Sequence, residues 1–182
     1  KKKPKNLKLL KKLKMRQIKI NSTTGSEIVT TSEFKDYARI SNSSDDTLIA
    51  NIIVQARIWC ENYISRDIVA KNRTYYLPDT VGIFDLPFGP VASITSIHVD
   101  GEAYTDYTTP GLDNESIDLD GPADEVKVVY VTTGLSDKLL EQAILQYATT
   151  LYDNRHDYQV GNINEVPSSS KAILNSYKNM FI

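Results

Sequence analysis

Cysteine, histidine and long apolar runs are what this sequence has least of. Its 182 residues include one cysteine, Cys60, and two histidines, His98 and His156. A single thiol excludes both an intramolecular disulfide and a metal site built from several cysteines. Neither histidine has a second one at the spacing of a zinc motif, so we expect no bound metal.

No apolar run reaches the roughly 18–20 residues that cross a bilayer, and the basic N-terminus leads into no apolar signal region. We therefore expect a soluble globular chain with neither a membrane span nor a secretory signal.

Features of catalytic or cofactor sites are also few. None of the eight glycines forms a phosphate-binding loop. Cys60 follows Trp59 in an apolar helical pattern, which favours a buried hydrophobe over a reactive thiol. Asp118 and Asp120 match only a fragment of a calcium-binding loop, and exposed hairpin loops explain them better. We predict that the chain is not an enzyme and binds no cofactor. A small hydrolase around Cys60 and His156 remains an alternative, because the members of a catalytic triad meet only in space.

Charge is divided unevenly along the chain. The net charge is −2, but residues 1–20 carry ten Lys and Arg and no acidic residue. The remaining 162 residues hold eleven Lys and Arg against all 23 Asp and Glu. An acidic body repels nucleic acid and anionic membranes on average, so only the N-terminal segment can attract them.

Three interpretations of this basic N-terminal segment are open. Leu7, Leu10 and Leu13 recur at helical spacing among lysines, as in a basic amphipathic helix. The segment can be a solvated arm, it can dock on DNA or on an acidic partner, or the residues before Met15 can precede the true start of the protein. If it binds a partner, the candidate contacts are Lys8, Lys11, Lys12 and Lys14.

Helical periodicity predicts four helices, over about 31–40, 45–65, 136–153 and 169–180. Thr30 and Glu33 have the spacing of a capping box at the start of the first helix. Ser43 or Ser44 can cap the second helix, and Ser136 can cap the third. The second helix carries a wide apolar face, which is typical of a bundle core and includes Leu48, Ile52, Ala56, Trp59 and Tyr63.

Between about residues 73 and 133 the apolar pattern changes to the alternation of short strands. Within it, Asp100-Gly101 is a strong hairpin signal. We therefore predict an α+β fold, mainly a helical bundle core of about four helices with an inserted antiparallel β-hairpin or meander region. The predicted domains are a basic N-terminal arm over about 1–28 and one folded domain over about 29–182.

Four short motifs follow one another along the chain. Residues 30–40 read T-x-x-E-h-K-x-h-x-R-I, where h is apolar, and residues 86–97 read L-P-x-x-P-V-x-S-I-x-S-I. Residues 130–134 read Y-x-x-T-G, and residues 151–155 read L-Y-x-N-R. In this order, and over about Val29 to Arg155, they resemble the head–tail connector (neck adaptor) family of tailed bacteriophages.

This resemblance implies a structural virion protein, assembled in the host cytoplasm and located in the neck between capsid and tail. It implies a homo-oligomeric ring of about twelve copies beneath the portal protein. The ring would extend the DNA channel without sequence-specific contacts and dock the next neck or tail protein, a stopper or tail terminator. In related adaptors the C-terminal segment reaches into the portal. By position, its counterparts in this chain are Tyr177, Met180, Phe181 and Ile182.

The charge and the aromatic content agree with this resemblance. An acidic body suits a channel in which DNA slides without sticking. The eleven tyrosines suit contacts between proteins, because each buries a large ring and keeps a hydrated hydroxyl. The alternative function is a nucleic-acid-binding module that acts through the basic arm.

Overall fold

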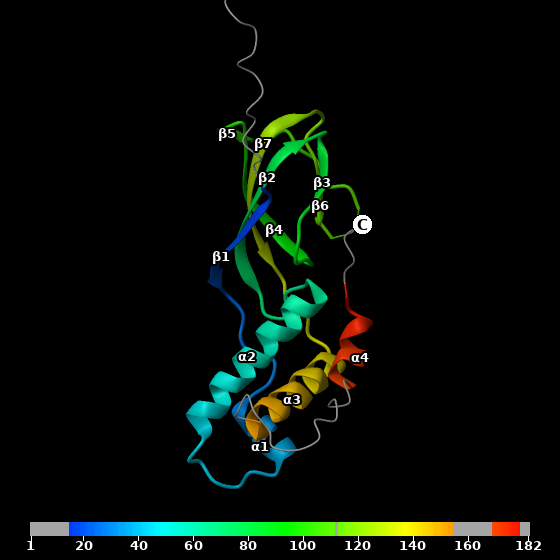
Figure 1. Ribbon diagram of the computed structural model, residues 1–182. Helices are drawn as coiled ribbons and strands as arrows, with labels where there is room; N and C mark the ends of the chain where they lie inside the picture. The colour runs from blue at the N-terminus through cyan, green and yellow to red at the C-terminus, as the bar shows by residue number, and fades with distance from the viewer. Residues whose placement is uncertain (1–14, 112, 155–168, 179–182) are drawn as a thin grey trace, which may run out of the picture. The chain divides into compact units, whose positions relative to one another are not determined.

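The structure is a computed structural model that describes residues 15–111, 113–154 and 169–178 (Figure 1). The chain forms two compact units, each with its own hydrophobic core. The sheet unit is made of the described residues within Lys1–Ser22, Asn72–Leu86 and Val91–Val131. The helical unit is made of those within Thr23–Lys71, Pro87–Pro90 and Thr132–Ile182.

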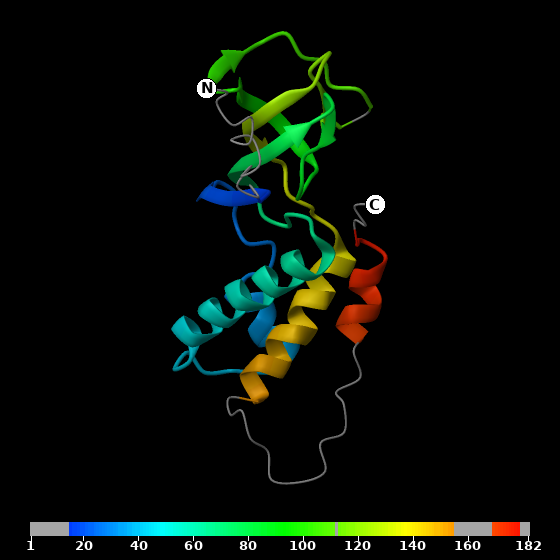
Figure 2. The same ribbon diagram turned by 45° about the horizontal axis from the view of Figure 1, so that its top comes forward.

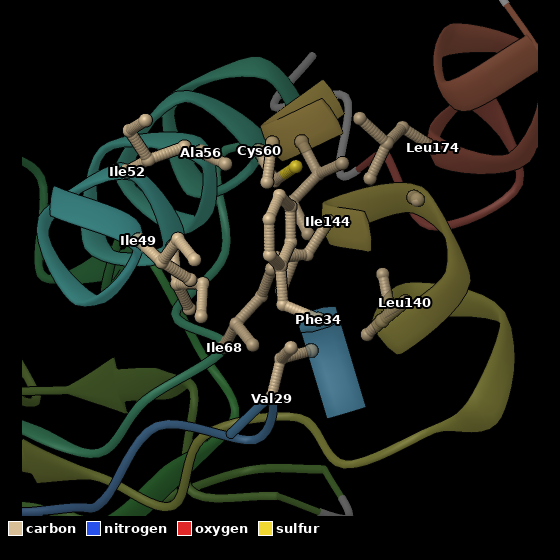
Figure 3. Packing of buried hydrophobic residues seen from close by; sticks show 14 residues of the cluster. Val29, Phe34, Ile49, Ile52, Ala56, Cys60, Ile68, Leu140, Ile144 and Leu174 are labelled. Carbon is tan, nitrogen blue, oxygen red and sulfur yellow. The ribbon is translucent and has the colours of Figure 1, made fainter. Parts of the chain in front are cut away.

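The helical unit contains α1 (Thr31–Ala38), α2 (Asp46–Ile64), α3 (Lys138–Asp153) and α4 (Ser169–Asn175). α2 and α3 lie side by side, and α4 packs against α3 (Figure 2). Their apolar faces enclose the aromatic ring of Phe34 from α1, which is fully buried (Figure 3). Ile49 and Cys60 of α2 and Leu140 and Ile144 of α3 point into the same core (Figure 3). Burial of these apolar side chains is the main favourable term in the stability of this unit.

The sheet unit contains β1 (Gln17–Thr23), β2 (Lys71–Thr80), β3 (Ile83–Asp85), β4 (Val91–Val99), β5 (Glu102–Tyr104), β6 (Ser116–Asp118) and β7 (Ala123–Thr132). Five strands form one sheet in the order β1-β2-β7-β4-β5, and β3 pairs with β6 in a second sheet (Figure 1). β2 and β7 are antiparallel, with Tyr75 opposite Val128 and Leu77 opposite Val126. These four side chains are buried in the core of the unit. Along most of β2 and β7, buried residues alternate with more accessible ones, which follows from the pleat of a strand.

The prediction of a mainly helical bundle core with an inserted β-meander is wrong. The fold is α+β, but its strands build a five-stranded sheet with a core of its own. β7 lies between β2 and β4 in the sheet, although it comes well after both of them in the sequence. Local periodicity reveals single strands and hairpins, whereas partners so far apart are chosen by tertiary packing.

The helix starts also differ in part from the prediction. The capping box is confirmed, because Thr30 Oγ1 accepts from the Glu33 amide (3.2 Å) and Glu33 Oε2 accepts from the Thr30 amide (2.8 Å). The caps predicted at Ser43 or Ser44 and at Ser136 are wrong. The N-cap of α2 is Asp45, whose side chain makes no capping bond, and the N-cap of α3 is Asp137, whose carboxylate accepts from the Leu139 amide (2.7 Å).

One strand of the sheet precedes the predicted connector domain in the sequence. β1 falls among the residues that the sequence groups with the basic arm, and Asn21 Nδ2 on it donates to Thr74 Oγ1 of β2 (2.9 Å). The division into an arm over about 1–28 and one domain over about 29–182 stays a prediction. In the described part of the chain, no helix combines the length and the apolarity that spanning a membrane requires.

Candidate partner-binding surfaces and the residues that support them

The motif that ends at residue 155 contributes to packing of the helices. Tyr152 of α3 donates from its hydroxyl to Asp45 Oδ2 at the start of α2 (2.6 Å). Its ring meets Phe34 of α1 edge to face, with 5.8 Å between the ring centroids. One tyrosine therefore fixes α3 to both preceding helices.

The glycine of the Y-x-x-T-G motif is required by a close approach of two backbone segments. Gly134 has a φ of +77°, a backbone conformation that residues with a Cβ atom rarely adopt. A Cβ atom there would lie 2.6 Å from the carbonyl oxygen of Ile68. The next amide, of Leu135, donates to that same oxygen (3.1 Å). The motif thus sets the path of the chain into α3.

A cluster of charged side chains, four of them buried and Glu27 partly exposed, lies at the C-terminal half of α2, and the sequence patterns missed it. We call it the ionic cluster; its members are Glu27, Arg57, Glu61, Asp67 and Lys71. Arg57 bridges Glu27 and Glu61, at 2.8 Å from each. Lys71 Nζ bridges Glu61 Oε1 (2.5 Å) and Asp67 Oδ1 (2.8 Å). The sequence signal was present, since Arg57 and Glu61 are four residues apart on one helix.

Hydrogen bonds satisfy the carboxylates of the ionic cluster. Glu61 Oε1 also accepts from the amides of Ile68 (3.0 Å) and Val69 (3.1 Å), and Asp67 Oδ2 accepts from the Thr132 hydroxyl (2.8 Å). Burial lowers the pKa of Arg57, but hydrogen bonds and charge from Glu27 and Glu61 outweigh it and raise that pKa above its ordinary value. The arrangement fixes the backbone after α2 and offers no open position for a substrate.

The C-terminal residues predicted to reach a portal protein are described only in part. Tyr177 follows α4, and its hydroxyl bonds to Asp137, which raises the pKa of Tyr177 and lowers that of Asp137. Leu174 of α4 is fully buried and anchors this helix in the core. Met180, Phe181 and Ile182 lie outside the described residues, as do Lys8, Lys11, Lys12 and Lys14 of the basic segment.

An aromatic cluster joins α2, α3 and the end of α4 at the surface of the helical unit. The Trp59 ring stacks on Tyr147 at 4.0 Å and on Tyr63 at 5.4 Å between centroids. Tyr63 donates from its hydroxyl to Asn175 Oδ1 (2.8 Å), and Lys178 Nζ lies 5.2 Å from the centre of its ring. The cluster holds the chain in place just before the apolar C-terminal tip.

The residues considered for catalysis do not form an active site in the described part of the chain. Cys60 is fully buried, and burial raises the pKa of its thiol to about 12, so the nucleophilic thiolate is suppressed. His156 of the alternative hydrolase lies outside the described residues. The described residues hold no group of three or more His, Cys, Asp or Glu side chains arranged to bind a metal ion.

One small hollow in the sheet unit contains the other histidine. Its volume is about 220 Å³, and its lining includes Tyr76, His98, Glu125 and Lys127. Such a volume is below the roughly 300–1,000 Å³ of sites for small molecules. Tyr76 already donates to Glu125 (3.0 Å), so two of its polar groups satisfy each other.

Solved structures with the same fold come from the necks and virions of gene transfer agent (GTA) particles. A chain in the neck of an empty GTA particle, computed with C6 symmetry, superposes with a TM-score of 0.72 at 16% identity, covering 91% of this chain and 97% of that one. A chain of the native GTA virion gives 0.69 at 14% identity, covering 91% and 96%. A chain in the native GTA neck, computed with C12 symmetry, gives 0.62 at 16% identity, covering 88% and 96%. No curated protein sequence matches this chain.

The sequence itself matches a family over most of its length. The matched residues are 28–178, which include every helix described above and six of the seven strands. The family is described as "Phage gp6-like head-tail connector protein". Residues 28–178 contain all four motifs, and these motifs supply the capping box, Gly134 and the Tyr152 contacts. The chain therefore belongs to the phage gp6-like head-tail connector family, whose members are structural proteins of the virion.

Proposed function

We propose that the chain is the subunit of an adaptor ring that docks beneath the portal protein, extends the DNA channel and presents a surface to the next neck or tail protein. The observation that carries the proposal is the family match over residues 28–178. The likeness to chains in necks computed with C6 and C12 symmetry supports a ring, because those necks repeat a subunit around one axis.

The construction of the helical unit supports a role as a scaffold. Its charged ionic cluster is buried and paired, its thiol is suppressed, and its aromatic cluster anchors the end of α4. The ion pairs and the stacked rings hold the helices of the unit in fixed positions. A rigid subunit loses little conformational entropy when it enters an assembly.

The C-terminal tip is the proposed portal contact, through Tyr177, Met180, Phe181 and Ile182. Support comes from the anchoring of Tyr177 and of the helix before it. Leu174 is buried and Asp137 accepts from the Tyr177 hydroxyl, so the chain is fixed up to Tyr177. The last residues in the sequence, Met-Phe-Ile, are apolar and suited to a pocket on a partner.

Mixing the full chain with purified portal protein tests both proposals. By native mass spectrometry and electron microscopy we expect a closed ring on the portal. A variant in which residues 179–182 are replaced by Ser-Gly-Ser-Gly should bind the portal at least roughly tenfold more weakly. It keeps Leu174 and Tyr177 and should retain the helical circular dichroism of the full chain.

The outcomes separate the two claims. A full chain that stays monomeric with portal protein present would overturn the adaptor function. A ring that forms equally well with the Ser-Gly tip would leave the adaptor function standing and remove the tip from the portal contact. As a control, Lys171→Ser alters an exposed residue on α4 and should leave portal binding unchanged.

A further inference from the structure

The five-stranded sheet ends in two edge strands of different character. β1 forms one edge, and each of its seven residues is exposed, including Ile18 (38%) and Ile20 (49%). β5 forms the other edge with three residues, of which Glu102 and Ala103 are exposed. An edge strand carries unpaired backbone donors and acceptors that can pair with another chain.

The β1 edge is basic. Arg16 and Lys19 are exposed on it, and residues 1–14, which precede it in the sequence, contain eight lysines and no acidic residue. Asn21 Nδ2 donates to both Asn72 Oδ1 (2.6 Å) and Thr74 Oγ1 (2.9 Å), which fixes β1 on β2. The strand is therefore held in the sheet, and no strand among the described residues pairs with its outer edge.

The β5 edge is acidic. Residues 99–126 contain nine Asp and Glu and no Lys or Arg. Asp100, Glu102 and Asp106 flank or belong to β5. Asp100 Oδ1 accepts from the amides of Asp124 (3.0 Å) and Glu125 (2.9 Å), so the start of β7 brings two further carboxylates to the turn before β5.

We propose that the β1 edge of one copy docks against the β5 edge of the next copy. This rests on the adaptor ring proposed above and names the surfaces through which its subunits meet. The two edges belong to the same sheet unit but differ in sequence, so their contact is head-to-tail, the kind that closes into a ring when repeated around an axis. Opposite charge steers the two edges together, and the exposed side chains of Ile18 and Ile20 supply apolar area beside Ala103.

A second copy fits these surfaces better than nucleic acid does. DNA would be attracted to the β1 edge, but the carboxylates at the β5 edge would repel it and would remain unmatched. A second copy matches both edges at once. It also covers an exposed seven-residue edge strand that would otherwise favour aggregation.

Reversal of charge on one edge at a time tests the contact. The basic-edge variant carries Arg16→Glu and Lys19→Glu, and the acidic-edge variant carries Glu102→Lys and Asp106→Lys. Each full-length variant alone should need a roughly tenfold higher concentration than wild type for half of its subunits to enter rings. An equal mixture should assemble better than either variant, into rings in which native mass spectrometry finds the two masses in equal numbers. Asp36→Lys and Lys171→Glu, on exposed sites of the helical unit, are the matched controls and should assemble as wild type does.

Disulfide trapping tests the same contact between subunits without reversing any charge. In a Cys60→Ala background, Lys19→Cys combined with Glu102→Cys should give covalent multimers under mild oxidation, whereas either cysteine alone should give dimers at most. The proposed contact would be overturned if wild type and both charge variants formed rings equally well and the cysteine pair gave no covalent multimers. That result would leave the proposal of an adaptor ring standing. A wild-type chain that forms no ring, even on portal protein, would overturn the adaptor function instead.

Discussion

At the scale of single residues, the helical unit buries the charged side chains of Arg57, Glu61 and Lys71 as well as the thiol of Cys60. Cys60 was predicted to be a buried hydrophobe, and it is fully buried with a raised pKa. The burial of Arg57, Glu61 and Lys71 was not predicted, because a charged residue in a sequence is assigned to the surface by default. The four-residue spacing of Arg57 and Glu61 indicates a pair on one helix but not whether that pair is buried. Their burial is possible only because each charge has a partner of opposite sign, and those partners come from segments that fold back on α2.

Glu61→Leu tests how much the helical unit depends on the ionic cluster. The change leaves the amides of Ile68 and Val69 without an acceptor and removes one of two carboxylates from Lys71. We expect the free energy of unfolding to fall by about 3–5 kcal/mol, measured by urea titration. The double variant Glu61→Leu/Lys71→Met should be less stable still, because it also leaves the buried carboxylate of Asp67 without Lys71.

The control for this experiment is Glu141→Leu, which removes the partner of the exposed Lys138. Its effect on the urea midpoint should be much smaller, because solvent screens that pair. Equal effects at Glu61 and Glu141 would contradict a stabilising role for the ionic cluster.

At the scale of elements, local signals located most helices and one hairpin. The capping box places the start of α1 at Thr31, and the turn at Asp100-Gly101 has positive φ at both residues (52° and 92°), as a tight hairpin requires. Pairing of β2 with β7 was not predictable in this way, because their partners lie about fifty residues apart and no turn joins them.

Thr30→Ala tests the capping box and its dependence on pH. Hydrogen bonds from the backbone and hydroxyl of Thr30 lower the pKa of Glu33 below its ordinary value of 4.5. Their stabilising effect is therefore present above the pKa of the unfolded state and is lost as pH falls through the lower pKa of the folded state. The variant should be less stable by about 1 kcal/mol at pH 7 by thermal or urea unfolding.

The difference in stability between wild type and Thr30→Ala should narrow as the pH falls below 4.5, because protonated Glu33 accepts these bonds more weakly than the carboxylate does. Ser32→Ala is the matched control: it alters an exposed hydroxyl one residue inside α1 and should leave stability nearly unchanged. A constant difference down to pH 2 would show that Glu33 takes no part in the cap.

At the scale of the whole molecule, basic and acidic residues are concentrated in different segments of the sequence, and the sheet holds residues of the two kinds apart. Residues 1–20 are strongly basic and residues 99–126 strongly acidic. β1 overlaps the end of the first of these segments and β5 belongs to the second, and these two strands are the opposite edges of one sheet. A chain with a small net charge thus carries two complementary surfaces.

Replacement of the eight lysines within residues 1–14 by glutamine tests the alternative function of nucleic-acid binding. The formal charge would fall from −2 to −10, and β1 would remain intact. If the arm binds DNA, affinity in fluorescence anisotropy should fall at least tenfold and lose most of its dependence on salt. DNA affinity unchanged by the replacement would exclude the arm as the DNA contact. Ring assembly is measured with the same variant, so that an effect of the arm on DNA binding is told apart from an effect on the contact at the β1 edge.

The sequence by itself determined the local features: the capping box, the hairpin turn, the buried thiol, the four helical stretches and the order of motifs that resembles the connector family. These depend on interactions within a few residues or on a pattern that can be read along the chain. Tertiary structure alone decided that five strands form one sheet with its own core and that the five residues of the ionic cluster meet. It also decided that β1, with basic residues in and beside it, and β5, with acidic ones in and beside it, occupy opposite edges of that sheet. The physical reason is that burial and strand pairing reward contacts between distant segments, and a single sequence carries no local mark of which distant segments will meet.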